Sequence, residues 1–66
     1  MMRRIEAFKG DTKIALLKED LNGKWRVFVY SNRQTFRHPE GGWTEQQAKD
    51  FVTTYIGGEA TFKERL

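Results

Sequence analysis

Few side chains in this 66-residue sequence could perform acid–base or nucleophilic chemistry. The single histidine, His38, stands beside Pro39 at the expected end of a strand, where an exposed histidine without a chemical role is the better interpretation. The carboxylates are scattered, mostly in expected turns or beside basic residues, as on a solvated surface. No serine or threonine has an evident base, and the glycine pairs lack the spacing of a phosphate-binding loop. The sequence therefore predicts no catalytic residues and no enzyme.

Metal and cofactor sites are equally unsupported. The chain has no cysteine and one histidine, so we expect no disulfide, no zinc site and no cofactor. No apolar run reaches the ~18 residues of a membrane span, and the first residues lack the apolar core of a signal peptide. We expect a soluble, cytoplasmic protein that does not bind membranes and has no evident small-molecule substrate.

The pattern with most chemical content is an alternation of basic and aromatic residues. Arg26, Phe28 and Tyr30 would lie on one face of a strand, because side chains of a strand alternate between its two faces. Aromatic rings can stack on unpaired bases while arginine holds phosphates. The net charge is +3, and most of the basic residues lie in residues 1–38. This part of the chain is therefore expected to meet an anionic partner.

The elements that position these residues follow from periodicity and turn signals. Thr44 and Gln47 form a capping box before an apolar stripe that ends at Gly57-Gly58, which predicts a helix over 44–57. Residues 3–38 are expected to form an antiparallel sheet, and 59–66 a tail that adds a short strand or frays. The predicted fold is a single α+β domain, residues 1–66: a β-meander of three to four strands with one helix on one face.

Residues 12–21 allow two interpretations. Asp11 could cap a helix there and Gly23 could end it. A strand is favoured because Asn22-Gly23, a strong hairpin signal, needs a partner for the strand that follows it. The choice matters, since a helix would remove the central strand of the sheet.

Pairing the strands with even-numbered turns at Gly10-Asp11 and Asn22-Gly23 divides the sheet into two faces. The face expected to lie under the helix carries Ile5, Ala7, Ile14, Leu16, Trp25, Val27, Val29 and Phe36. The opposite face is expected to carry Arg4, Phe8, Lys13, Ala15, Leu17, Arg26, Phe28, Tyr30 and Arg37. One helix cannot cover both faces, so the second must meet water or a partner.

Two hypotheses follow for that second face. The favoured one is binding of single-stranded DNA or RNA, with a candidate site of Arg4, Phe8, Lys13, Arg26, Phe28, Tyr30, Arg33 and Arg37. The alternative is a protein-interaction module or a small regulator of phage or plasmid type, which would use the same face and could form a homodimer.

The element order over residues 3–57 resembles two groups of nucleic-acid-binding modules. A meander followed by a helix is similar to the sheet-and-helix units of the PUR and Whirly single-strand binders. It also resembles the three-stranded sheet and helix of AP2-type and integrase arm-binding domains, in which Gly-Lys-Trp-Arg, here Gly23 to Arg26, is a common strand start. The resemblance implies binding to nucleic acid and assigns no residue to a site.

Overall fold

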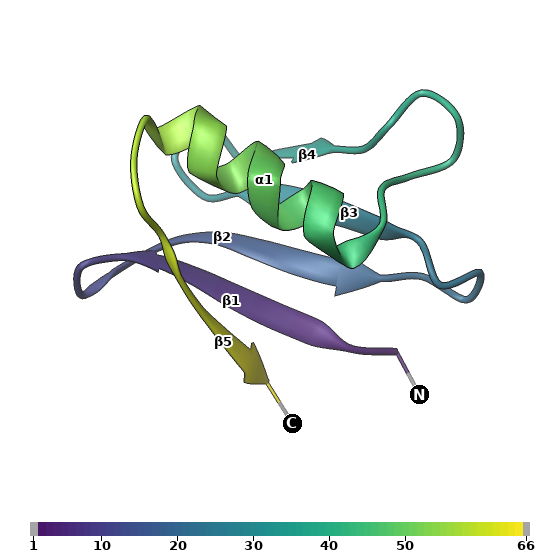
Figure 1. Cartoon of the computed structure of the whole chain (residues 1–66), viewed down its shortest axis with the longest axis horizontal. Coiled ribbons are helices and arrows are strands. Elements are labelled where there is room, and N and C mark those ends of the chain that lie inside the picture. The colour runs from purple at the N-terminus through teal and green to yellow at the C-terminus, as the bar shows by residue number, and fades with distance from the viewer. Residues whose placement is uncertain (1, 66) are drawn as a thin grey trace.

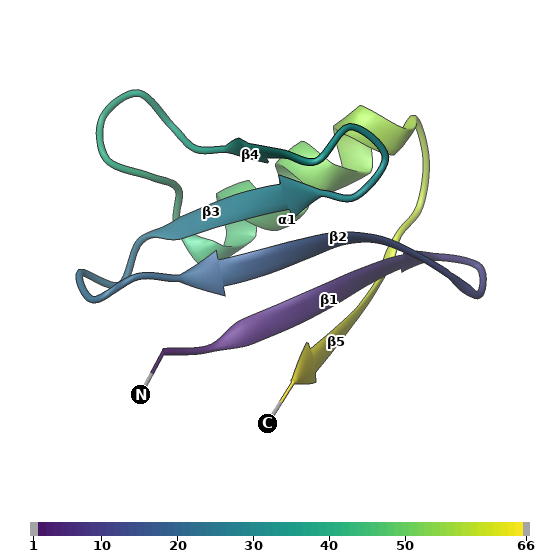
Figure 2. The same cartoon turned by 180° about the vertical axis from the view of Figure 1, so that it is seen from behind.

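The computed structural model describes residues 2–65, which form a five-stranded antiparallel sheet and one helix. The strands are β1 (Arg4–Lys9), β2 (Thr12–Glu19), β3 (Trp25–Val29), β4 (Gln34–Phe36) and β5 (Thr61–Arg65). Their order in the sheet is β4-β3-β2-β1-β5, and α1 (Glu45–Ile56) packs on one face (Figure 1). Figure 2 shows the other face, with the strands in front of the helix. The predicted α+β meander with one helix is confirmed, and the tail forms the fifth strand.

The helix begins and ends where its capping residues predict. The Thr44 side chain accepts a hydrogen bond from the Gln47 N–H, and the Gln47 side chain accepts one from the Thr44 N–H. Gly57 ends the helix with φ of 72°, in the left-handed region that glycine adopts without steric cost. These caps satisfy backbone groups that would otherwise have no partner at the two ends of α1.

Residues 12–19 form strand β2, not the alternative helix. Residues 20–24 join β2 to β3, and because the Asp20 N–H donates to the Lys24 carbonyl, the loop itself consists of the three residues 21–23. The Gly23 N–H donates to the Asp20 carbonyl, and Gly23 has a φ of 76°. The Asp20 carboxylate accepts hydrogen bonds from the N–H groups of Asn22 and Lys24. A loop of this length with glycine in the left-handed position is a common hairpin connection.

The predicted pairing of β2 with its neighbours is wrong by one residue. The three-residue loop pairs Leu17 with Val27, whereas even-numbered turns would have placed Leu16 opposite Val27 or Val29. On the other side, a β-bulge places the extra residue Ile14 in β2, so that Ala7 pairs with Ala15 and Ile5 with Leu17. A shift of one residue exchanges the two faces of a strand.

The exchange corrects three face assignments, all within β2. Ala15 and Leu17 are buried under the helix, although the sequence placed them on the opposite face. Leu16 lies on that opposite face instead. Ile14, the extra residue of the bulge, is half-buried against the core on the helix side, where the sequence placed it. The buried core consists of Ile5, Ala7, Ala15, Leu17, Trp25, Val27, Val29, Ala48 and Val52.

The loop between β4 and α1 returns to the sheet immediately before the helix. Trp43 pairs with Trp25 through two backbone hydrogen bonds of 2.6 and 3.0 Å. Its ring stacks on Phe51, with centroids 4.6 Å apart, and so anchors the entry of α1 against β3. Within residues 2–65 there is no helix whose length and apolar character would allow it to cross a membrane.

Candidate nucleic-acid interface

The sheet has one face that no element of residues 2–65 covers, and we call it the open face. Alternation along the paired strands assigns it Arg4, Glu6, Phe8, Lys13, Leu16, Lys18, Arg26, Phe28, Thr35, Thr61, Lys63 and Arg65. The helix lies on the opposite side, as the two views show (Figures 1 and 2). Six of these residues are basic, and Glu6 is the one acidic residue that the described strands place here.

Four basic residues form a line across four neighbouring strands, and we call it the basic row. Arg65 pairs with Arg4, Arg4 with Lys18, and Lys18 with Arg26. Residues directly opposite in antiparallel strands have Cβ atoms only ~4.5–5.5 Å apart, and like charges in such positions destabilise a sheet. Among the described residues, Arg4, Lys18 and Arg26 form no salt bridge. The row is therefore a concentration of positive charge that the fold leaves largely uncompensated.

Three members of the basic row border a common hollow. Arg4, Lys18 and Arg26 line a depression of about 410 Å³ together with Met2 and Glu19. One carboxylate oxygen of Glu19 accepts a hydrogen bond from the Arg3 backbone N–H at 3.1 Å. The fold therefore already uses one of the two oxygens of this carboxylate. The hollow can offer guanidinium and ammonium donors to an anion from three adjacent strands.

Aromatic side chains occupy the part of the open face farther along the strands. The rings of Phe28 and Tyr30 meet edge to face with centroids 5.2 Å apart, and Tyr30 is 37% exposed. The ammonium of Lys63 lies 5.5 Å from the centre of the Phe8 ring on β1. Arg26 and Tyr30 are four residues apart, which is about 13 Å along an extended strand. Positive charge and ring surface thus lie side by side on the open face.

Outside the hollow, Glu6 neutralises part of the positive charge of the open face. Its carboxylate contacts the Lys13 ammonium at 2.8 Å and the Arg65 guanidinium at 3.2 Å. The hydrogen bond from Lys13 is the main cause that lowers the pKa of Glu6 below its ordinary value, so Glu6 stays ionised at neutral pH. Lys13 and Arg65 are consequently less available to a ligand than the three cations at the hollow.

The structure brings together six of the eight residues that the sequence predicted for the site. Arg4, Phe8, Lys13, Arg26 and Phe28 lie on the open face, with Tyr30 directly after β3 beside Phe28. Arg33 and Arg37 lie outside the paired strands that define it. Arg33 occupies the β3–β4 turn in the left-handed region, with φ of 55°, and Arg37 follows β4 where the pairing with β3 has already ended at Phe36.

Sequence reasoning missed three basic residues of the open face. Lys18 was overlooked because the one-residue shift of β2 was not foreseen. Lys63 and Arg65 were overlooked because the tail was not assigned a face. The alternation of Thr61, Lys63 and Arg65 with Phe62 was the available signal, since it has the period of a strand with one apolar face.

The helix side of the sheet has a different electrostatic character, because its charges are paired. The Arg3 guanidinium bonds both oxygens of Glu64 and one oxygen of Glu45, each at 2.7 Å, and lies 5.3 Å from the Trp25 ring centre. The hydrogen bond from Arg3 is the main cause that lowers the pKa of Glu64. For Glu45, the hydrogen bond from Lys49 lowers the pKa most, followed by that from Arg3. This network joins β5 and α1 to the residue that precedes β1.

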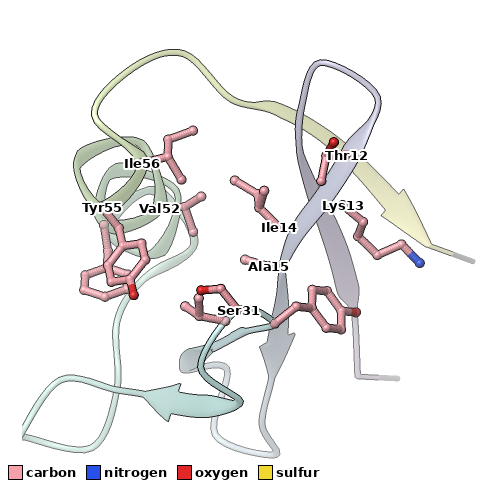
Figure 3. A pocket seen from close by; sticks show the side chains of 11 residues that line it. Thr12, Lys13, Ile14, Ala15, Ser31, Val52, Tyr55 and Ile56 are labelled. Carbon is pink, nitrogen blue, oxygen red and sulfur yellow. The ribbon is translucent and has the colours of Figure 1, made fainter.

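A second depression lies between the later half of α1 and the sheet. It measures about 330 Å³ and is mostly apolar, with lining residues Thr12, Lys13, Ile14, Ala15, Val29, Tyr30, Ser31, Phe51, Val52, Tyr55 and Ile56. Ile14 points across it toward the helix, whereas the Lys13 side chain extends away from it (Figure 3). It therefore offers no charged group to an anion.

Residues 2–65 hold no cluster of three or more histidine, cysteine, aspartate or glutamate side chains suited to a metal ion. His38 is engaged locally, because its Nδ1 accepts a hydrogen bond from the Glu40 N–H at 3.1 Å. The concentration of unpaired cations beside exposed ring surface is thus the strongest candidate for a site. Comparison of the chain with models of protein families, with curated proteins and with solved structures found no match in any of the three.

Proposed function

We propose that this domain binds single-stranded DNA or RNA in the cytoplasm, without catalysing a reaction, through the open face of its sheet. The observation that carries the proposal is the basic row, in which Arg4, Lys18 and Arg26 are adjacent and form no salt bridge with the described residues. Phosphate groups are the partners that such a row suits best, because neutralising them releases counterions and gives binding energy that does not depend on sequence.

The cost of the basic row within the fold supports a role for it. Cross-strand pairs of opposite charge stabilise a sheet, whereas like charges directly opposite each other destabilise it. The same chain pairs Arg3 with Glu45 and Glu64 on the helix side, so acidic partners are used elsewhere in this molecule. Repulsion among the cations of the row falls when a phosphate binds between them, and this relief favours the complex.

Single strands are preferred to duplexes for a geometric reason. Phe28 and Tyr30 lie on the same face as Arg26 and farther along the chain, so a nucleic-acid strand whose phosphates meet the basic row can bring its next bases onto these rings. Stacking on an aromatic side chain needs an unpaired base whose face is free. The open face is also a broad sheet surface, which presents no helix to the major groove.

A protein partner is the second candidate, favoured by the apolar residues Leu16 and Phe28 at the centre of the open face. Two copies that meet with their basic rows superposed would repel each other, which disfavours a homodimer of that arrangement. An acidic protein is the form of partner that the charge distribution suits.

The test compares binding of a labelled single-stranded oligonucleotide with binding of the same sequence as a duplex, at low and moderate salt. We expect tighter binding of the single strand, and weaker binding when Tyr30→Ala removes a ring, by ~1–3 kcal/mol for each base stacked on it. Tyr55→Ala is the matched control, because Tyr55 is comparably exposed, at 46%, but lies on α1.

Equal losses in the two tyrosine variants would show that the ring on the open face has no special role. If the wild-type protein binds neither oligonucleotide at low salt, the proposed function is wrong. Sedimentation of the pure protein should give a monomer at all concentrations, and dimerisation abolished by Tyr30→Ala would instead support self-association through the open face.

A further inference from the structure

The hollow lined by Arg4, Lys18 and Arg26 lies at one end of the sheet, not at its centre. Arg4 is the first residue of β1, Lys18 the last but one of β2, and Arg26 the second of β3. The Phe28 and Tyr30 rings lie farther along β3, in the opposite direction from the β2–β3 loop. A single nucleic-acid strand that stacks its bases on those rings and runs toward the hollow therefore reaches the edge of the open face at the hollow.

Two consecutive carboxylates, one of them in the lining of the hollow, lie at this end of the sheet. Glu19 lines the hollow, and Asp20 follows it in the loop. The pKa of Asp20 is lowered, mainly by the hydrogen bond from the Lys24 N–H, so this carboxyl is ionised at neutral pH. A phosphate chain that continued past the hollow would have to pass these negative charges, whereas a chain that ends in the hollow would not.

Three cations around one depression also exceed what an internal phosphate requires. An internal phosphodiester carries one negative charge, whereas a terminal phosphate monoester carries about −1.5 to −2 at pH 7 and has three acceptor oxygens. Two guanidinium groups and one ammonium can surround such a group, and arginine can bond two of its oxygens at once.

We infer that this hollow binds the terminal phosphate of a single strand, an inference that rests on the proposed function. The ligand class is a phosphate monoester at the end of an oligonucleotide. The terminal phosphate is held by Arg4, Lys18 and Arg26, and the adjoining bases lie toward Phe28 and Tyr30.

The experiment measures the affinity of the wild-type protein for one single-stranded oligonucleotide with a 5′ phosphate, with a 3′ phosphate, and with hydroxyl groups at both ends. We expect one phosphorylated form to bind on the order of tenfold more tightly than the hydroxyl form, as one additional charged hydrogen bond would provide. Inorganic phosphate at the same concentration serves as the competitor that separates the anion alone from the strand end.

The preference should disappear in Arg26→Gln and in Lys18→Gln, and persist in Arg37→Gln, which removes a positive charge outside the hollow. A thermal unfolding curve for each variant shows that it is folded. Equal binding of all three oligonucleotides by the wild-type protein overturns this inference and leaves the proposed function standing. A preference that survives Arg26→Gln and Lys18→Gln would also overturn it. If no oligonucleotide binds at all, the proposed function fails, and the inference fails with it.

Discussion

Lys18 is the residue of the candidate site that has like charges directly opposite it on both neighbouring strands. It is half-buried in β2, with Arg4 directly opposite on one side and Arg26 on the other. A side chain flanked by two like charges is repelled from both, and the strands hold it there because the backbone ladder fixes their register. Lys18 is also the member of the basic row that the sequence did not reveal.

Replacing Lys18 with glutamine should raise the stability of the free protein. Glutamine keeps much of the side-chain length while removing the charge, so repulsion with Arg4 and Arg26 is relieved. We expect the free energy of unfolding in urea to rise by about 0.2–1 kcal/mol at low salt, and the gain to shrink as salt screens the charges. Lys9→Gln, at the opposite end of β1, is the control and should change stability little. A clear loss of stability in Lys18→Gln would mean that the row does not carry the repulsion assigned to it.

Among the elements, β2 separates what the sequence could predict from what it could not. The hairpin signal at Asn22-Gly23 predicted that β2 is a strand. The apolar stripe and the capping residues predicted the helix α1. The sequence did not predict which side chains of β2 face the helix, because Asn22-Gly23 is compatible with loops of two, three or four residues. The three-residue loop puts Leu17 in the position under the helix that a two- or four-residue loop would give to Leu16. The bulge at Ile14 has no sequence signal of its own, since it depends on the pairing with β1.

The candidate site was predictable in part for the same reason. Arg4, Phe8, Arg26 and Phe28 lie on strands whose faces the predicted register had right. The basic row itself was not predictable, because it depends on the register of β2 and on the position of β5 beside β1. Contacts between residues far apart in the sequence are set by the whole sheet and not by a local pattern.

The segment that leads into α1 gives a prediction at the scale of the element. Gly42 has a φ of 124°, and a Cβ there would lie 2.9 Å from the Lys24 Cβ and 3.1 Å from the Trp25 carbonyl oxygen. Gly42→Ala should therefore destabilise the protein by ~2 kcal/mol or more, since strain and crowding act together. The crowding would disturb the pairing of Trp43 with Trp25 that anchors the helix entry.

Gly41→Ala provides the comparison for that prediction. Gly41 also has a positive φ, of 100°, but a Cβ there would meet nothing within 4 Å. It should cost less than Gly42→Ala, because only backbone strain is added. Equal midpoints of thermal unfolding for the two variants would contradict the close approach of Gly42 to β3.

At the scale of the molecule, the two sides of the sheet handle charge differently. The helix side pairs Arg3 with Glu45 and Glu64, and the open face leaves most of its cations without partners. The paired carboxylates contribute stability, because their pKa values are lowered in the folded state. The open face, which we propose to bind single strands, carries adjacent cations at a cost in stability.

The lowered pKa values predict acid sensitivity with a defined sign. A carboxyl whose folded pKa is lowered contributes stability above its ordinary value of 4.5 for Glu45 and Glu64, and that stability is lost as pH falls through the folded pKa. We expect the urea midpoint to be nearly constant from about pH 7 to pH 5 and to fall below about pH 4.5. Glu64→Gln should lower the midpoint at pH 7 and flatten the acid decline.

Glu59→Gln is the matched control for this prediction, because Glu59 is an exposed carboxylate that forms no salt bridge with the described residues. Its curve should follow the wild type. If Glu64→Gln shows the same acid decline as the wild type, the Arg3 network is not the source of the pH dependence.

The central claim, that the basic row binds the phosphates of a single strand, is tested most directly by the salt dependence of oligonucleotide affinity. For single strands, the slope of log K against log salt concentration is about −0.7 for each phosphate neutralised. We predict a negative slope for the wild type, a slope about 0.7 shallower for Lys18→Gln, and an unchanged slope for Lys9→Gln. The claim would be contradicted if Lys18→Gln and Lys9→Gln left affinity and slope equally unaffected.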